Sequence, residues 1–99
     1  MTDYSGLYAE TEKRILHVMM ELHDILSDFE QKEVNEFLDV REYGLALGTL
    51  SHILVDEAKP IKPNLLHEID EIAISMDLRD ERFMYDLHNS YDRQSARQA

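Results

Sequence analysis

The apolar residues of the chain recur every three or four positions, which is the spacing of an amphipathic α-helix. The first such run extends from about Ser5 to Leu26. Its apolar face carries Tyr8, Ile15, Met19, Leu22 and Leu26. Leu16 and Met20 lie off this face, where they are placed to touch a second neighbour. The run predicts a first helix over residues 5–26.

A second helix is predicted from Ser27 to about Asp39. Ser27 precedes Glu30 by three residues, which is the capping-box pattern: each side chain accepts a hydrogen bond from the backbone amide of the other residue. The inner face of this helix carries Val34, Phe37 and Leu38. The opposite side carries a slanting row of acids, Glu33, Glu36 and Asp39.

Residues 41–55 predict a third helix that is apolar around most of its circumference, which is typical of an element packed on more than one side. One face carries Tyr43, Leu47, Leu50 and Leu54. Gly44 and Gly48 lie in its interior, where each costs roughly 1 kcal/mol of helix stability against alanine. We therefore expect neighbouring backbones to approach closely at the glycines, and we place this helix at the centre of the fold.

A loop that contains Pro60 and Pro63 separates the third helix from a fourth one. Pro63 suits the first turn of a helix, because its fixed backbone angle and missing amide cost nothing there. The inner face of the fourth helix carries Leu65, Ile69, Ile72 and Met76. We expect short connections to place successive helices antiparallel.

The last quarter of the chain has a weaker apolar period. Asp80 is placed to cap a short fifth helix that carries Phe83, Met84 and Leu87. Residues 91–99 are polar and aperiodic, so we expect them to fray and their removal from residue 92 onward to leave stability unchanged. No stretch alternates at the period of a strand. The prediction is one all-α domain over residues 1–90, with four main helices, a short fifth one and a polar tail.

The charge of the chain points to the kind of partner it binds. Twenty-one acidic residues oppose ten basic ones, and the formal net charge of −11 disfavours nucleic acid and anionic membranes but favours basic proteins. Ten of the acids lie in residues 21–57, where only Lys32 and Arg41 oppose them, a local charge of −8. From Arg79 onward, four acids balance four arginines. We therefore predict a partner-binding surface formed by Glu33, Glu36, Asp39, Glu42, Asp56 and Glu57.

The composition also bounds the compartment. The chain has no cysteine, so it has neither disulfides nor thiolate metal sites. The first residues contain no apolar segment of a signal peptide, and no apolar run reaches the roughly 20 residues of a membrane helix. We expect a soluble, cytoplasmic protein without a membrane partner, and we favour a monomer.

Candidate catalytic and metal-binding residues are few. His17 and Glu21 are one helical turn apart and are able to share an ion, but His23 lies about 120° away from His17 around the helix. The HExxH zinc pattern, a nucleophile elbow and a glycine-rich phosphate loop are all absent. His52 and Asp56 have the spacing of a surface pair. We expect no metal, no cofactor and no enzymatic activity.

The third helix and its exit also carry a family signature: the run EYGLAL at residues 42–47, then Leu50, Leu54, Glu57, Pro60 and Ile61. This pattern resembles the core of MafI-type immunity proteins, and the resemblance covers roughly residues 15–78. Such proteins are similar in role to the immunity partners of contact-dependent growth inhibition systems and other bacterial polymorphic toxins. The resemblance implies a small helical inhibitor of the C-terminal domain of a cognate toxin.

The first expectation for function is therefore tight, charge-complementary binding to such a toxin. A nuclease, with tRNA as one candidate substrate, fits the charge best because nuclease clefts are basic. One alternative is an acidic nucleic-acid mimic that inhibits a DNA-binding enzyme, although the neutral end of the chain counts against it. The other alternative is a small metal-dependent helical enzyme that uses His17, Glu21 and nearby acids.

Overall fold

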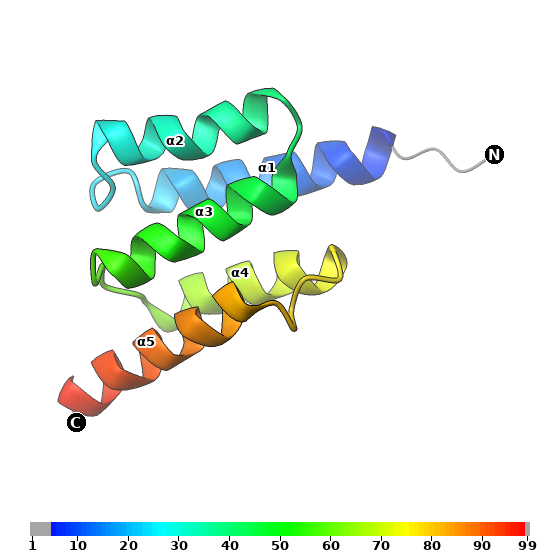
Figure 1. Ribbon diagram of the computed structural model, residues 1–99. Helices are drawn as coiled ribbons and strands as arrows, with labels where there is room; N and C mark the ends of the chain where they lie inside the picture. Colours follow the sequence, from blue (N-terminus) through cyan, green and yellow to red (C-terminus); the bar gives the residue numbers. More distant parts are fainter. Residues whose placement is uncertain (1–4, 99) are drawn as a thin grey trace.

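The computed structural model describes residues 5–98, with side chains from residue 8 to residue 97, and this part of the chain forms five α-helices and no strand (Figure 1). The helices are α1 (Ser5–Glu21), α2 (Asp28–Asp39), α3 (Tyr43–Asp56), α4 (Pro63–Ser75) and α5 (Arg82–Gln98). The prediction of an all-α fold is confirmed. So are the start of the second helix and the extent of the third and fourth ones, to within about two residues.

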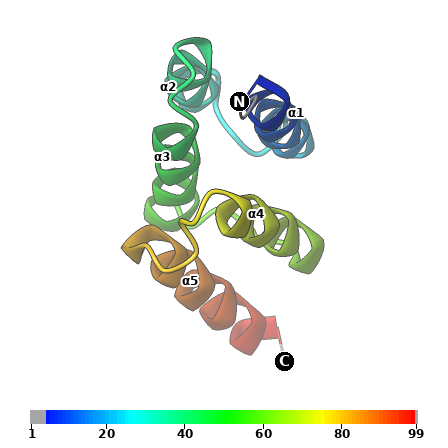
Figure 2. The ribbon, with the colours of Figure 1, turned by 90° about the vertical axis from the view of Figure 1, so that its right-hand side faces the viewer.

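α3 is the central helix, as the sequence predicts. It lies between α2 and α5 and also packs against α1, while α4 packs against α1 and α5 (Figures 1 and 2). Its residues Leu47, Leu50 and Leu54 are at most 1% exposed. Burial of each leucine side chain stabilises the folded state by roughly 1.5–3 kcal/mol. Because α3 contacts α1, α2 and α5, this burial stabilises the packing of all three helices on α3.

The inner faces predicted for the other helices supply the rest of the core, except for Tyr8 of the first helix, which is 51% exposed. Buried residues include Ile15 and Leu22 of α1 and its exit, Val34 of α2, Ile69 of α4 and Leu87 of α5. Leu16 and Met20 of α1 are 44% and 76% exposed, so the expected second neighbour does not exist within the described residues. Ser51 of α3 is fully buried, and its hydroxyl has no hydrogen-bond partner among them.

α1 ends at Glu21, five residues before the predicted end. The residues that follow form a turn in which Leu22 and Leu26 remain buried, so the apolar period continues although the helix does not. The side chain of Gln31 donates to the carbonyl oxygens of His23 and Leu26, at 3.2 and 3.0 Å. These bonds satisfy carbonyl groups that a continued helix would have paired internally.

Three helices end in the same way although none of them ends in glycine. Arg41, Ala58 and Asp77 follow α2, α3 and α4 with φ of 61°, 49° and 60°. In each case the amide of the next residue bonds back to a carbonyl five residues earlier, as in the donation from Lys59 to Leu54 at 2.9 Å. This is the Schellman pattern, in which the left-handed residue allows the chain to leave the helix sharply.

The fifth helix is longer than the sequence predicts and includes most of the predicted polar tail, while Ala99 lies outside the described residues. α5 begins at Arg82, directly after Glu81 rather than after Asp80, and continues to Gln98. Ser90 is buried and Tyr91 packs on the core. The side chain of Gln94 accepts from the amide of Ile61 at 2.9 Å and donates to the carbonyl of Lys59 at 2.8 Å. Hydrogen bonds of Gln94 therefore stabilise the last turns of α5, which have no apolar periodicity.

The glycines of α3 make room for side chains rather than for backbones. A Cβ atom at Gly48 would lie 3.7 Å from two ring carbons of Phe83 in α5, and one at Gly44 would lie 3.5 Å from Leu78. The expected close approach of neighbouring backbones is therefore wrong. Because 3.7 Å is an ordinary contact distance, the space beside Gly48 accepts a methyl group.

Substitution of Gly48 tests this packing. Gly48→Ala should raise the free energy of unfolding by roughly 1 kcal/mol, because alanine is the better helix former and its methyl group fits. Gly48→Leu should lower it by roughly 1–3 kcal/mol, because the longer side chain overpacks against Phe83. Urea unfolding of both variants measures the two effects. A leucine variant as stable as the wild type would show that the position is not confined.

The contacts of Gln94 predict a cost for losing the end of α5. Gln94→Ala should lower the free energy of unfolding by roughly 1–3 kcal/mol, because it leaves the amide of Ile61 and the carbonyl of Lys59 unpaired. Ser95→Ala, an exposed neighbour, should change it by no more than about 0.5 kcal/mol. Chemical denaturation compares the pair. Equal stability of the two variants would mean that water replaces the glutamine without loss.

Candidate functional site

An acidic groove lies between α2 and α3. Only residues 40–42 separate these helices, so they run antiparallel, and the first turns of α2 lie beside the last turns of α3 (Figure 1). The acidic groove has a volume of about 440 Å³. It is lined by Phe29, Glu30, Glu33, Thr49, His52, Ile53, Asp56 and Glu57.

The groove brings together three of the six acids predicted to bind a partner: Glu33, Asp56 and Glu57. Glu36 and Asp39 line a separate hollow of about 380 Å³ on α2. The cause is helix geometry, since each step of three residues turns back by about 60°, which carries Asp39 about 120° away from Glu33. Glu42 is exposed in the connection to α3, at the other end of α2 from the groove. The six acids are therefore divided between the groove, the second hollow on α2 and the connection between α2 and α3.

Phe29 is a feature of this groove that the sequence analysis missed. It lies in the first turn of α2 and is 71% exposed, with the carboxylates of the groove around it. A signal was available, because Phe29 falls about 140–180° around the helix from the buried Val34 and Leu38. Aromatic residues, phenylalanine included, are enriched in protein interfaces relative to the rest of the surface. His52, which its spacing pairs with Asp56, forms no ion pair with it within the described residues, and its ring centroid lies 6.4 Å from that of Phe83.

The free negative charge of the groove belongs to three carboxylates. Glu33, Asp56 and Glu57 form no ion pair with the side chains described. Asp56 ends α3 and Glu57 follows it, where the helix dipole is also negative. The helix does not stabilise these charges, and the groove therefore presents a concentrated negative potential to a partner.

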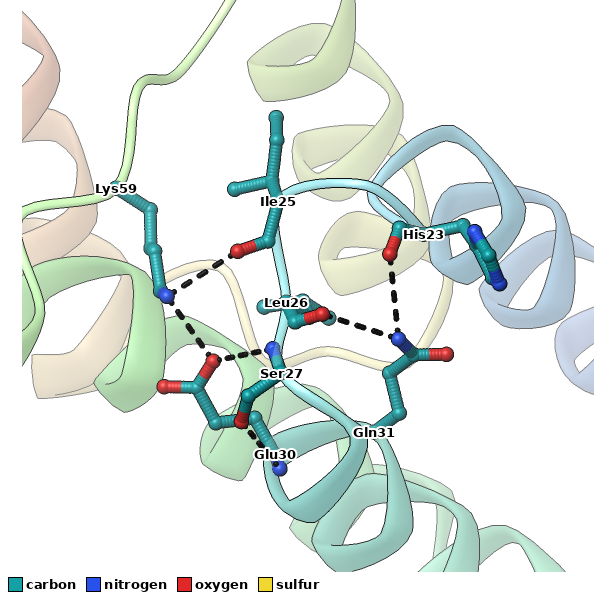
Figure 3. A network of polar contacts seen from close by, with 7 residues as sticks. All are labelled: His23, Ile25, Leu26, Ser27, Glu30, Gln31 and Lys59. Carbon is teal, nitrogen blue, oxygen red and sulfur yellow. Dashed lines mark hydrogen bonds and ion pairs between the residues drawn. The ribbon is translucent and has the colours of Figure 1, made fainter.

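Glu30, the fourth acid of the groove, has a structural role. Its carboxylate accepts from the amide of Ser27 at 2.8 Å, and the Ser27 hydroxyl accepts from the amide of Glu30 at 3.1 Å. Lys59 Nζ lies 3.0 Å from the Glu30 carboxylate and also donates to the carbonyl of Ile25 at 3.1 Å (Figure 3). The predicted capping box is therefore confirmed, and Lys59 joins it to the turn after α1 and to the loop after α3.

These contacts change the acidity of Glu30. The hydrogen bond from the Ser27 backbone, followed by the bond from Lys59, lowers the pKa of Glu30 from its ordinary value of 4.5. Both contacts favour the charged carboxylate. The groove thus contains one carboxylate, that of Glu30, which is fixed by a hydrogen bond and an ion pair. The other three carboxylates form no ion pair with the side chains described.

A second group of ionisable residues lies between α1 and α4. His17 Nε2 is 2.9 Å from a carboxylate oxygen of Glu21 and 3.7 Å from one of Glu68. They lie in or beside a groove of about 480 Å³ that is also lined by Lys13, Arg14, His67 and Ile72. His23 does not join them but lies 3.3 Å from its neighbour Asp24. Glu68 is 47 positions beyond Glu21, so no local spacing in the sequence could have indicated it.

The lowered pKa of Glu30 predicts a pH dependence. Below about pH 4.5 the unfolded chain binds a proton that the native carboxylate resists, so stability is present above this value and is lost as the pH falls through the lower native pKa. Glu30→Gln should be less stable than the wild type at pH 7, and the difference should shrink below pH 4.5. Urea unfolding at stepped pH measures it.

The matched control is Glu33→Gln, which removes a carboxylate from the same groove without breaking an ion pair. Subtracting the change in the free energy of unfolding caused by Glu33→Gln from that caused by Glu30→Gln removes the general effect of losing one negative charge from an acidic protein. A Glu30→Gln difference that stays constant from pH 7 to pH 3 would contradict the assignment of the stabilising contacts to the charged form of Glu30.

The chain was compared with protein-family models, curated proteins and solved structures, and none matched. None of the helices described in residues 5–98 is long and apolar enough to cross a bilayer.

Proposed function

We propose that this protein is an immunity protein that neutralises the toxic domain of a cognate bacterial toxin by binding a basic surface through the acidic groove. The observation that supports this most is the exposed ring of Phe29 among the unpaired carboxylates of Glu33, Asp56 and Glu57. An aromatic anchor provides binding energy on desolvation, and the surrounding charges speed encounter and select a basic partner.

The resemblance to MafI-type immunity proteins supports the same role. Its signature leucines, Leu47, Leu50 and Leu54, are buried in α3, so the signature describes the scaffold that carries the groove. Both α2 and α3 are held by core packing, so the groove is formed before a partner arrives. The protein acts in the cytoplasm as an inhibitor with no catalysis of its own. A nuclease, with tRNA as one candidate substrate, is the toxin that suits an acidic inhibitor.

A nucleic-acid mimic is the second candidate. Such a protein presents regularly spaced negative charge over most of its surface, but here the charge is balanced from residue 79 onward. The acidic groove also contains the exposed ring of Phe29, an apolar contact that imitation of phosphate charge does not require. These two features favour the toxin inhibitor.

The test is protection of growing cells. The polypeptide encoded by the adjacent upstream gene is expressed with and without this protein, and the protein should abolish the growth arrest. Charge reversal of the groove acids to lysine (Glu33, Asp56 and Glu57) should abolish protection. The matched control reverses the three predicted acids outside the groove (Glu36, Asp39 and Glu42), with the same change in total charge, and should still protect. Equal behaviour of the two variants would exclude the groove as the interface.

Binding kinetics separate the charges from the aromatic anchor. The groove reversal should slow association with the purified toxin domain by at least about tenfold at low salt and weaken the dependence on ionic strength. Phe29→Ala should instead raise the dissociation rate by roughly 30-fold, the effect of losing about 2 kcal/mol at an anchor. Stopped-flow measurements at several salt concentrations give both rates. An unchanged dissociation rate would remove Phe29 from the interface.

A further inference from the structure

An imidazole and two carboxylates converge between α1 and α4, away from the acidic groove. The ligand atoms of His17, Glu21 and Glu68 all lie within 4.8 Å of one another. Ligand atoms around a tetrahedral zinc ion are about 3.4 Å apart, so the three groups need only small side-chain rotations to share one ion. We propose that His17, Glu21 and Glu68 form a binding site for a divalent transition-metal ion of the zinc type.

The packing of α1 on α4 determines where these three ligands lie. Each of them is followed in the chain by a residue of the core: Val18, Leu22 and Ile69, which are at most 1% exposed. The ligands therefore lie at the rim of the interface between the two helices, with their backbones held by buried neighbours. The side chains themselves remain accessible, at 62%, 31% and 34% exposure for His17, Glu21 and Glu68. An ion reaches the site from solvent without any opening of the core.

The charges around the cluster favour a divalent cation. Glu21 and Glu68 each form an ion-pair contact only with His17 among the described residues. Lys13 and Arg14 line the same groove but form no ion pair there. When the imidazole is neutral, as metal binding requires, two carboxylates face each other without a cation. An ion of charge +2 balances both.

The ligand types select the class of metal. One imidazole and two carboxylates suit Zn²⁺, whereas Mg²⁺ and Ca²⁺ prefer sites made only of oxygen atoms. Three protein ligands leave a fourth position for water. The ion should bind the native protein and not the unfolded chain, because only folding brings Glu68 close to His17. Binding of the ion should therefore stabilise the native protein by mass action. The site shares no residue with the acidic groove, so it is independent of the proposed inhibition.

The test uses Zn²⁺ alone and the full-length protein, freed of metal by a chelator and carrying no histidine tag. Isothermal titration should show one site. His17→Ala and Glu68→Gln should each weaken zinc binding by at least about tenfold. Loss of a group that only hydrogen-bonds to a metal ligand already costs about that much, and loss of a ligand should cost no less. His23→Ala, which removes an exposed histidine near the end of the same helix, should bind as the wild type does. Zinc should raise the melting temperature of the wild type and of His23→Ala.

The outcomes are decisive because these side chains are exposed and the variants should fold, which far-UV circular dichroism verifies. Glu21→Gln supplies a further ligand variant if either of the first two fails that check. Wild-type affinity in Glu68→Gln would show that zinc binds an adventitious pair on α1, and the proposal would fail. Wild-type affinity in His17→Ala, or no binding to the wild type, would overturn it as well. None of these results bears on protection against a toxin.

Discussion

The burial of α3 on several sides is the constraint from which the rest of the structure follows. Leu47, Leu50 and Leu54 are at most 1% exposed, and α1, α2 and α5 are all needed to cover the helix. Because residues 40–42 are the whole connection to α2, that helix must return antiparallel. The first turns of α2 are then forced against the last turns of α3, and the acidic groove forms where they meet.

That arrangement concentrates like charges, and one lysine limits the cost. Lys59 neutralises Glu30, the acid that also caps α2, and leaves Glu33, Asp56 and Glu57 without ion pairs. Negative charge at the end of α3 opposes the helix dipole, which costs typically 0.3–1 kcal/mol for each exposed group. A surface optimised for stability alone would carry basic residues there. These acids do not stabilise the fold, which agrees with the proposed role of the groove as a binding surface.

The sequence was sufficient for features that depend on local spacing. The helical period predicted the core faces, and the Ser27–Glu30 pair predicted how α2 begins. It was insufficient where a contact joins distant parts of the chain. Gln94 holds the end of α5 through bonds to residues more than 30 positions earlier, and Glu68 meets His17 across two helices. The acids of α2 divide between two hollows for a different reason, because a row of residues at spacing three turns around the helix.

The separation of core from groove has a consequence for how the proposed inhibitor would change its partner. Truncating a buried leucine of α3 typically costs 2–5 kcal/mol, a large part of the stability of a small domain. Substituting an exposed acid that has no ion pair usually costs no more than about 0.5 kcal/mol. Asp56 and Glu57, which are exposed and form no ion pair within the described residues, are therefore free to change in sign while α3 stays as it is. A binding surface built on unpaired side chains above a fixed core can thus acquire new specificity without a new fold.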